Sequence, residues 1–242
     1  MAPDLISFEG VVAGYGALTI LNELSFATKQ GEITLLIGPN GAGKSTVLKT
    51  LFGLLAPRAG AIRFKGEAVG GLKPAAMLRH GIAFVPQGRN LFPALSVRHN
   101  LELGAITLPP AQRRARFDEA IARFPHLQSR IDNQASTLSG GEQKQLEIAR
   151  ALQLRPDVIL IDEPSIGLSP IINQQVFALL RGLADAGTSV LMVEQNVRAA
   201  LAVSDRVLLL EGGRLMLDSP ADTLLADPDL NRVFLGKTVA AD

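Results

Sequence analysis

The feature that most constrains this chain is a glycine-rich octapeptide, Gly38-Pro39-Asn40-Gly41-Ala42-Gly43-Lys44-Ser45. The run before it, Ile33–Ile37, is continuously apolar, as in a strand that is buried on both faces. After it, apolar residues recur at helical spacing at positions 47, 48, 51, 54 and 55. A strand, a glycine-rich turn and a helix in this order direct backbone N–H groups and the positive end of a helix dipole at one anion. The sequence therefore predicts a phosphate-binding loop.

The residues of this phosphate loop have expected roles. Glycine lets the backbone wrap around phosphate oxygens, Lys44 would reach the β- and γ-phosphates, and Ser45 would bind Mg²⁺. We therefore expect ATP and Mg²⁺ as cofactors. The predicted nucleotide contacts of this segment are Gly38, Pro39, Asn40, Gly41, Ala42, Gly43, Lys44, Ser45 and Thr46.

Strand and helix patterns alternate along most of the chain. Short apolar runs at 5–8 and 24–26 indicate an initial β-rich part that is interrupted at Gly14-Tyr15-Gly16. Further strands are expected at 82–85, 158–161, 189–193 and 207–210, and apolar spacing from 172 to 183 predicts a helix. This alternation is typical of an α/β fold with a mostly parallel sheet.

The stretch from about 87 to 155 differs, because it is mostly helical and is broken by Pro109-Pro110 and Pro125. It has the pattern of an insertion into an α/β core. We predict one domain over residues 1–242, with a core of residues 1–87 and 156–242, a β-rich N-terminal subdomain within that core, and a helical subdomain at about 88–155.

Composition argues against several classes of protein. The chain has 24 basic and 23 acidic residues, and this net charge of +1 does not predict a nucleic-acid surface. It has no cysteine, so we expect no disulfide and no cysteine-bound metal, in keeping with a reducing compartment. No signal peptide is evident at Met1-Ala2-Pro3-Asp4, and no apolar run approaches the roughly 18–20 residues that span a bilayer. Any membrane association is therefore expected to go through a partner.

Two adjacent carboxylates end the apolar run Val158-Ile159-Leu160-Ile161-Asp162-Glu163. In phosphoryl-transfer sites a carboxylate in this position organises the Mg²⁺ shell, and we assign that role to Asp162. The side chain of Glu163 points elsewhere on the strand, where it could polarise the attacking water as a general base. An acidic strand end is by itself often only a solvated terminus, but the phosphate loop upstream favours a functional interpretation.

A second candidate anion site is the segment Leu138-Ser139-Gly140-Gly141-Glu142-Gln143, which precedes apolar residues at helical spacing. Ser139 and Glu142 predict a capping box, so a well-capped helix is the simpler interpretation. The hexapeptide also resembles the signature motif of ABC ATPases, which other phosphate-loop enzymes lack. In that family the motif binds the γ-phosphate held by the other subunit. The resemblance implies that Ser139, Gly140, Gly141 and Glu142 contact nucleotide, and that one chain supplies half of each of two sites.

Other family elements follow in the expected order. Tyr15 resembles the aromatic residue that stacks on adenine, although a buried or turn tyrosine is the alternative. Gln87 resembles the glutamine that contacts Mg²⁺ and the water and links the core to the helical insertion. The segment Ser165-Ile166-Gly167-Leu168-Ser169 takes the place of the dimer-contact loop, but departs from the commoner Ser-Ala-Leu-Asp form.

Gln195 is the most informative departure from the family pattern. Most members have a histidine after the strand that corresponds to 189–193, where it contacts the γ-phosphate. The chain's three histidines, at 80, 99 and 126, all precede Asp162, so none is available. Glutamine can donate a hydrogen bond to phosphate but carries no charge. The resemblance then implies a catalytic set of Lys44, Gln87, Glu163 and Gln195, with Ser45, Gln87 and Asp162 around the metal.

The motifs narrow the resemblance to the ATPase subunits of branched-chain (hydrophobic) amino-acid importers. ATPases for urea or amide uptake share the Pro-Gln-Gly-Arg form and stay open as an alternative. Lipopolysaccharide-export ATPases normally keep the histidine that Gln195 replaces. ABC ATPases of DNA repair or translation usually have coiled coils, tandem cassettes or basic surfaces. The stretches that carry the resemblance are Val85-Pro86-Gln87-Gly88-Arg89, Leu91-Phe92-Pro93, Glu163-Pro164-Ser165-Ile166-Gly167-Leu168-Ser169-Pro170, Val193-Glu194-Gln195-Asn196 and the closing Arg232-Val233-Phe234-Leu235-Gly236.

This resemblance also implies partners and a location. We expect a second, non-identical ABC ATPase subunit, two membrane permease subunits and, indirectly, an extracytoplasmic solute-binding protein, with no nucleic acid. The chain would be cytoplasmic and peripheral, on the inner face of the cell membrane. A groove near 87–92 would receive a cytoplasmic permease helix, with Leu91 and Phe92 as an apolar contact or as ordinary packing. Because such an ATPase never touches the solute, its residues do not encode which solute moves.

Overall fold

The computed structural model describes residues 4–226. The chain start at 1–3 and the motif stretch at 232–236 lie outside the described residues. The strands are β1 (Asp4–Tyr15), β2 (Leu18–Lys29), β3 (Ile33–Ile37), β4 (Ala59–Phe64), β5 (Glu67–Ala68), β6 (Ile82–Val85), β7 (Val158–Asp162), β8 (Ser189–Val193), β9 (Arg206–Glu211) and β10 (Arg214–Pro220).

The helices include two short 3-10 segments, named η. They are α1 (Lys44–Leu51), α2 (Pro74–Arg79), α3 (Val97–Gly104), α4 (Pro110–Arg123), α5 (Pro125–Gln128), η1 (Ala135–Thr137), α6 (Gly140–Ala151), η2 (Leu152–Leu154), α7 (Pro170–Asp185), α8 (Val197–Leu201) and α9 (Ala221–Ala226). The predicted helix from 172 to 183 is confirmed within α7. The predicted extension of α1 to positions 54 and 55 is wrong, because Gly53 takes a left-handed φ of 77° directly after the helix ends.

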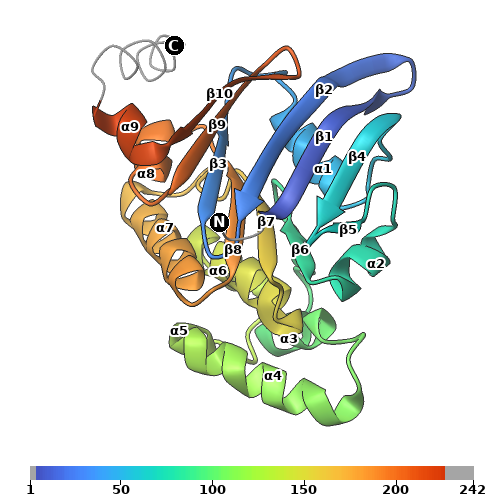
Figure 1. Ribbon diagram of the computed structural model, residues 1–242. Helices are drawn as coiled ribbons and strands as arrows, with labels where there is room; N and C mark the ends of the chain where they lie inside the picture. The colour runs from blue at the N-terminus through green and yellow to red at the C-terminus, as the bar shows by residue number, and fades with distance from the viewer. Residues whose placement is uncertain (1–3, 227–242) are drawn as a thin grey trace.

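Two sheets form the body of the molecule (Figure 1). The larger has the order β10-β9-β3-β8-β7-β6, and its strands are parallel except for β10. The smaller is antiparallel with the order β2-β1-β4-β5. This arrangement confirms the predicted α/β fold with a β-rich N-terminal part.

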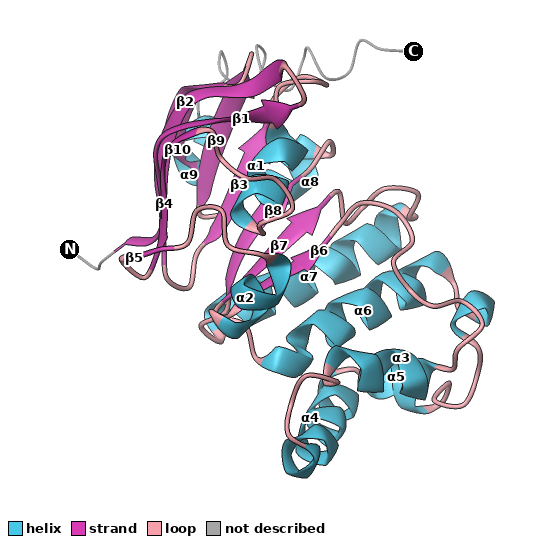
Figure 2. Cartoon of the chain, turned by 90° about the vertical axis from the view of Figure 1, so that its right-hand side faces the viewer, coloured by secondary structure: helices cyan, strands magenta, loops and turns pink. Residues whose placement is uncertain are grey.

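The strand β3 is buried at all five positions, and four of its residues are apolar; the fifth, Thr34, donates its hydroxyl to Glu32 at 2.9 Å. Ile33, Leu35 and Ile37 pack into a core that also contains residues of α6, α7 and α8. Leu36 points to the other face, into a core shared by α1, the larger sheet and the smaller sheet. Burial on both faces therefore favours a nearly continuous apolar run, which the sequence provides apart from Thr34. In Figure 2, α1 lies between the two sheets, as this second core requires.

Helices from α3 to η2 occupy the stretch between β6 and β7; α3, α4 and α5 form the lower lobe in Figure 1, whereas α6 packs against the larger sheet. The prolines in this stretch begin helices: Pro110 is the first residue of α4, and Pro125 is the first residue of α5. The domain and subdomain boundaries at 87–88 and 155–156 stay a prediction. No helix within residues 4–226 is long and apolar enough to cross a bilayer.

Candidate nucleotide site

The predicted phosphate loop, residues 38–45, connects the end of β3 to the start of α1. Gly38 and Gly43 have φ angles of 146° and 103°, which side-chain-bearing residues rarely adopt. A Cβ atom at Gly38 would overlap the carbonyl oxygen of Leu210, and one at Gly43 would lie 2.9 Å from the Leu21 side chain. Both conformation and space therefore require glycine at these two positions.

Lys44 is buried at the first position of α1. Its Nζ donates hydrogen bonds to the carbonyl oxygens of Gly38 at 2.7 Å and Pro39 at 3.0 Å. Burial lowers the pKa of Lys44, and the charges of Glu163 and Asp162 oppose that shift. The loop thus holds a partly desolvated cation close to both strand-end carboxylates.

Ser45 and Asp162 join the start of α1 to the end of β7. The Ser45 hydroxyl donates to Oδ1 of Asp162 at 3.1 Å. Asp162 is only 2% exposed, and burial raises the pKa of its carboxyl above the ordinary value, while the Ser45 hydrogen bond opposes this. A hydroxyl and a carboxylate are oxygen ligands of the kind that Mg²⁺ accepts, so this pair fits a magnesium site.

Glu163 is held between two glutamine amides. Gln87 donates from Nε2 to Oε2 of Glu163 at 2.6 Å, and Gln195 donates from Nε2 to Oε1 at 2.7 Å. The three residues follow the neighbouring strands β6, β7 and β8, so the parallel sheet itself brings them together. Glu163 is buried and has a φ of 49°, a strained value for a residue with a side chain. Three of the four predicted catalytic side chains therefore form one hydrogen-bonded group.

Two buried carboxylates near this group received no role from the sequence. Glu194 accepts hydrogen bonds from three backbone N–H groups. Glu147 of α6 accepts from the backbone N–H of Asn90 at 2.8 Å and from Lys144 at 2.6 Å, which ties the segment after Gln87 to α6. The available signal was their position beside apolar residues: Glu147 lies between Leu146 and Ile148, and Glu194 directly follows the run 190–193. A carboxylate buried there needs a partner.

The predicted signature loop, residues 139–142, begins α6 and contains the predicted capping box. Oγ of Ser139 accepts from the Glu142 backbone N–H at 3.3 Å, and Oε2 of Glu142 accepts from the Ser139 N–H at 2.8 Å. A Cβ atom at Gly140 would lie 3.2 Å from Leu168, and one at Gly141 would overlap Ile172. The glycines therefore let the loop lie directly against the start of α7.

The structure does not bring the signature loop or Tyr15 onto the phosphate loop. Within residues 4–226, no hydrogen bond or ion pair joins residues 139–142 to residues 38–45. Tyr15 is 46% exposed at the end of β1, where it pairs with Leu18 of β2. The same hairpin reaches the phosphate loop through Ile20 and Leu21, which approach Gly43.

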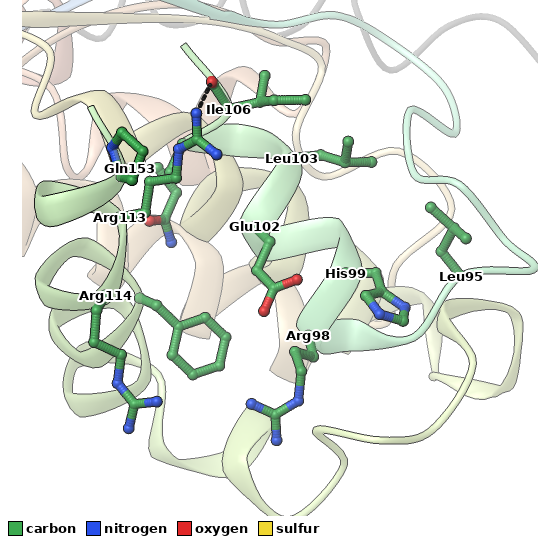
Figure 3. Close-up of a pocket in the computed structure, with 12 residues that line it drawn as sticks. Leu95, Arg98, His99, Glu102, Leu103, Ile106, Arg113, Arg114 and Gln153 are labelled. Carbon is green, nitrogen blue, oxygen red and sulfur yellow. Dashed lines mark hydrogen bonds between the residues drawn. The ribbon is translucent and has the colours of Figure 1, made fainter. Parts of the chain in front are cut away.

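A separate cavity of about 690 Å³ lies between α3 and α4 (Figure 3). Arg98, Glu102 and Arg114 are among the residues that line it, and Arg113 donates to the carbonyl oxygen of Ile106 at 2.8 Å. None of the predicted nucleotide or metal residues lines this cavity. It is therefore distinct from the strand-end site described above.

Comparisons with known proteins agree with this geometry. The family model described as ABC transporter matches residues 21–166, more than half of the chain. The high-affinity branched-chain amino acid transport ATP-binding protein BraG of Pseudomonas aeruginosa is 41% identical over 96% of this chain and 100% of its own length. The lipopolysaccharide export system ATP-binding protein LptB of Escherichia coli K12 is 34% identical over 96% of this chain and 97% of its own length.

The fold agrees as well. A crystal structure of an ATP-binding cassette of an ABC transporter in its ADP conformation superposes with a TM-score of 0.85 at 26% identity, and the match covers 97% of this chain and 100% of that one. The strand-end carboxylates, the phosphate loop and the capped glycine loop thus occur on the fold that such cassettes have. The chain belongs to the ABC transporter family, as one of its ATPases.

Proposed function

We propose that this chain hydrolyses ATP to energise the import of branched-chain or other hydrophobic amino acids. The observation that carries the proposal is the strand-end group of Glu163, Gln87 and Gln195 beside the phosphate loop. Two comparisons favour import. The chain is 41% identical to a branched-chain amino acid transport protein but 34% identical to the lipopolysaccharide export protein. It also has glutamine at position 195, where export ATPases normally have histidine. An import ATPase is therefore favoured over an export ATPase.

In the proposed reaction, the phosphate loop and Lys44 bind the phosphates of ATP. On binding, the Lys44 ammonium exchanges a loop carbonyl for a phosphate oxygen, which is a stronger, charge-assisted contact. Glu163 accepts the proton of the attacking water. Gln87 and Gln195 fix the Glu163 carboxylate, so that its proton-accepting oxygens keep one orientation.

The proposed magnesium ligands are Ser45, Asp162 and Gln87. Gln87 donates to Glu163 through its amide nitrogen, which leaves its carbonyl oxygen Oε1 as the ligand atom. The bound ion would neutralise charge that develops on the phosphates. The raised pKa of Asp162 follows from its burial, so a nearby cation would favour the charged form of its carboxylate.

A second ATPase subunit would complete each site. Ser139 and Gly140 are exposed at the start of α6, whereas the phosphate loop is backed by β2 and β9 within the chain. Three residues of the signature loop, Ser139, Gly141 and Glu142, also line a cavity of about 520 Å³. We infer that residues 139–142 contact the ATP of the other subunit, which is non-identical in the proposed importer, and that Tyr15 stacks on the adenine bound by its own chain.

The chain would reach the membrane through two permease subunits, on the cytoplasmic side, with a solute-binding protein acting on the far side. Phe92 is 52% exposed and lines a groove of about 330 Å³ together with Phe84 and Leu103. Leu91 is half-buried and packs on the core. The apolar contact with a permease helix therefore rests on Phe92 more than on Leu91.

Co-purification of the full transporter tests the proposed solute class. The complex that carries this chain would be reconstituted in vesicles with its binding protein, and ATP hydrolysis would be measured with leucine, isoleucine, valine, urea or acetamide. Stimulation by the three amino acids supports the proposal. Stimulation by urea or acetamide alone would replace it with the related uptake system, and recovery with lipopolysaccharide-export proteins would replace it with export.

A further inference from the structure

Glu194 is a buried carboxylate at the end of β8 that none of the steps above uses. It is 2% exposed and directly follows Val193, the last residue of the strand. No cation pairs with it anywhere in the described part of the chain, residues 4–226. A buried charge of this kind is unfavourable unless hydrogen bonds replace its lost hydration.

Three backbone N–H groups supply those hydrogen bonds, and they belong to two different loops. Oε1 of Glu194 accepts from the N–H of Ser165 at 2.7 Å. Oε2 accepts from the N–H groups of Gln195 at 2.9 Å and Asn196 at 3.1 Å. One side chain thus joins the loop after β7 to the loop after β8.

The loop after β7 begins with Glu163 itself, and the loop after β8 carries Gln195, one of the two amides that bond to it. Ser165 lies two residues after Glu163, whose own N–H donates to the carbonyl oxygen of Val193 at 2.9 Å. Gln195, whose N–H is held by Glu194, donates its amide to Oε1 of Glu163 at 2.7 Å. Glu194 therefore anchors the chain two residues after the strained Glu163 backbone and, through the N–H of Gln195, the residue whose amide holds the Glu163 carboxylate.

The charge of Glu194 is what this arrangement needs. A carboxylate has only acceptor atoms, so both oxygens can receive backbone N–H groups at once. A glutamine of the same shape would turn one of the two atoms into a donor that faces another donor. One of the two loops would then lose its anchor, and the buried N–H groups would be left without a partner.

We propose that Glu194 is a positioning residue for ATP hydrolysis, which locks the 165–169 loop to Gln195 and so sets the orientation of Glu163. Because residues 165–169 lie at the proposed dimer contact, movement of this loop against a second subunit would pass through Glu194 to Glu163. The proposal rests on the role of Glu163 as the general base. It does not require Glu194 to touch ATP, Mg²⁺ or the water.

The test compares Glu194→Gln and Glu194→Asp with the parent in the full-length chain, within the complex with which it purifies. We expect kcat to fall roughly 10- to 100-fold in Glu194→Gln, as for small misplacements of a reacting group, while KM for ATP changes less than about twofold. Glu194→Asp keeps the charge but shortens the reach, and we expect an intermediate kcat. Equal kcat values for Glu194→Gln and the parent would overturn the proposal.

A matched control separates positioning from stability. Asp205 also accepts a backbone N–H, from Ile33 at 2.7 Å, at the other end of the sheet strands, and it pairs with Arg181 at 2.8 Å. Asp205→Asn should lower the melting temperature without a comparable fall in kcat. If Asp205→Asn and Glu194→Gln lose kcat only in proportion to lost folded protein, Glu194 is merely structural.

Two further measurements keep the result interpretable. Amide hydrogen exchange should rise in Glu194→Gln in the loop whose N–H group loses its acceptor, near 165–168 or 195–197; unchanged exchange in both loops would overturn the proposal. In a double-mutant cycle, Glu194→Gln and Gln195→Ala should be strongly non-additive in kcat, and additive losses would overturn the proposal. Lys44→Ala serves as a separate arm: if that variant still hydrolyses ATP, the proposed site fails independently of Glu194.

Discussion

The phosphate loop and the signature loop are both glycine-containing segments at helix N-termini, yet their surroundings differ. The phosphate loop has an exposed tip at 39–41, but its later residues are bonded to other parts of the chain: Lys44 bonds to loop carbonyls, and Ser45 bonds to Asp162 at the end of β7. The signature loop satisfies its polar groups internally through the Ser139 and Glu142 capping box and leaves its tip exposed. The phosphate loop thus contacts the proposed catalytic and metal residues of its own chain. The signature loop has no such partner within the described residues, and its first two residues face solvent.

The two loops also differ in the charged groups that surround them. The cation and the two carboxylates all lie at the phosphate loop, where burial shifts the pKa of Lys44 down and that of Asp162 up. At the signature loop, the Glu142 carboxylate is already bound to the Ser139 backbone N–H. The signature loop can therefore add neutral hydrogen-bond donors to a phosphate, but it does not duplicate the catalytic group.

Lys44→Ala should have the largest effect of any change in either region. It removes the buried cation of the phosphate loop, and we expect hydrolysis to fall by about 10²- to 10³-fold or more, with weaker Mg-ATP binding. Lys29→Ala, which removes an exposed lysine at the end of β2, is the matched control and should leave turnover unchanged. Near-normal turnover in Lys44→Ala would end the assignment of the site.

Ser139→Ala should have a smaller effect and should separate capping from catalysis. Loss of the N-cap is expected to cost about 1 kcal/mol, which lowers the melting temperature by roughly 2–4 °C. Loss of a phosphate contact would add a fall in kcat of roughly 10- to 100-fold. Ser96→Ala removes the equivalent cap of α3, where Ser96 accepts from the His99 N–H, and should change stability alone. Equal kcat in the two variants would mean that Ser139 only caps its helix.

Glu142→Gln should have the smallest effect, and its stability difference from the parent should depend on pH. Hydrogen bonds from Ser139 lower the pKa of Glu142 in the folded state. A lowered folded-state pKa contributes stability above the unfolded glutamate pKa, and this is lost as pH falls through the folded value. The parent should thus exceed Glu142→Gln in unfolding free energy near neutral pH, and the gap should close in acid. Glu211→Gln, which removes an exposed charge at the end of β9, is the control. A difference in unfolding free energy between parent and Glu142→Gln that does not change with pH would contradict the role of the capping box.

The sequence was informative where one local pattern dictates one structure. The apolar runs of β3, β6 and β8 coincide with the strands, and Ser139 and Glu142 form the predicted capping box. The roles of individual site residues stay predictions, although Asp162, Glu163 and Gln87 lie where parallel strands end together. Local patterns could not show the contact between Gln195 and Glu163, since it depends on the neighbouring order of β7 and β8.

Other features depended on long-range packing and had no local signal. Glu194 joins two loops that are 29 residues apart in the chain, so its role follows only from the folded arrangement. Gly141 lies so close to Ile172 that a side chain at position 141 would overlap it, and this requirement for glycine is visible only in the folded structure. The end of α1 was misjudged because the left-handed Gly53 overrides the apolar spacing that continues beyond it.

We expect a complete site to need the phosphate loop of one subunit and the signature loop of another. Glu163→Gln tests it most directly, because this variant should bind Mg-ATP but hydrolyse it very slowly. Size-exclusion chromatography with light scattering would measure its mass, alone and mixed with the second ATPase that copurifies with it, with and without Mg-ATP. We expect two ATPase subunits to associate only in the presence of Mg-ATP, and we expect this association to disappear when Lys44→Ala is added. A variant that binds Mg-ATP but keeps the mass of a single subunit in both mixtures would contradict it.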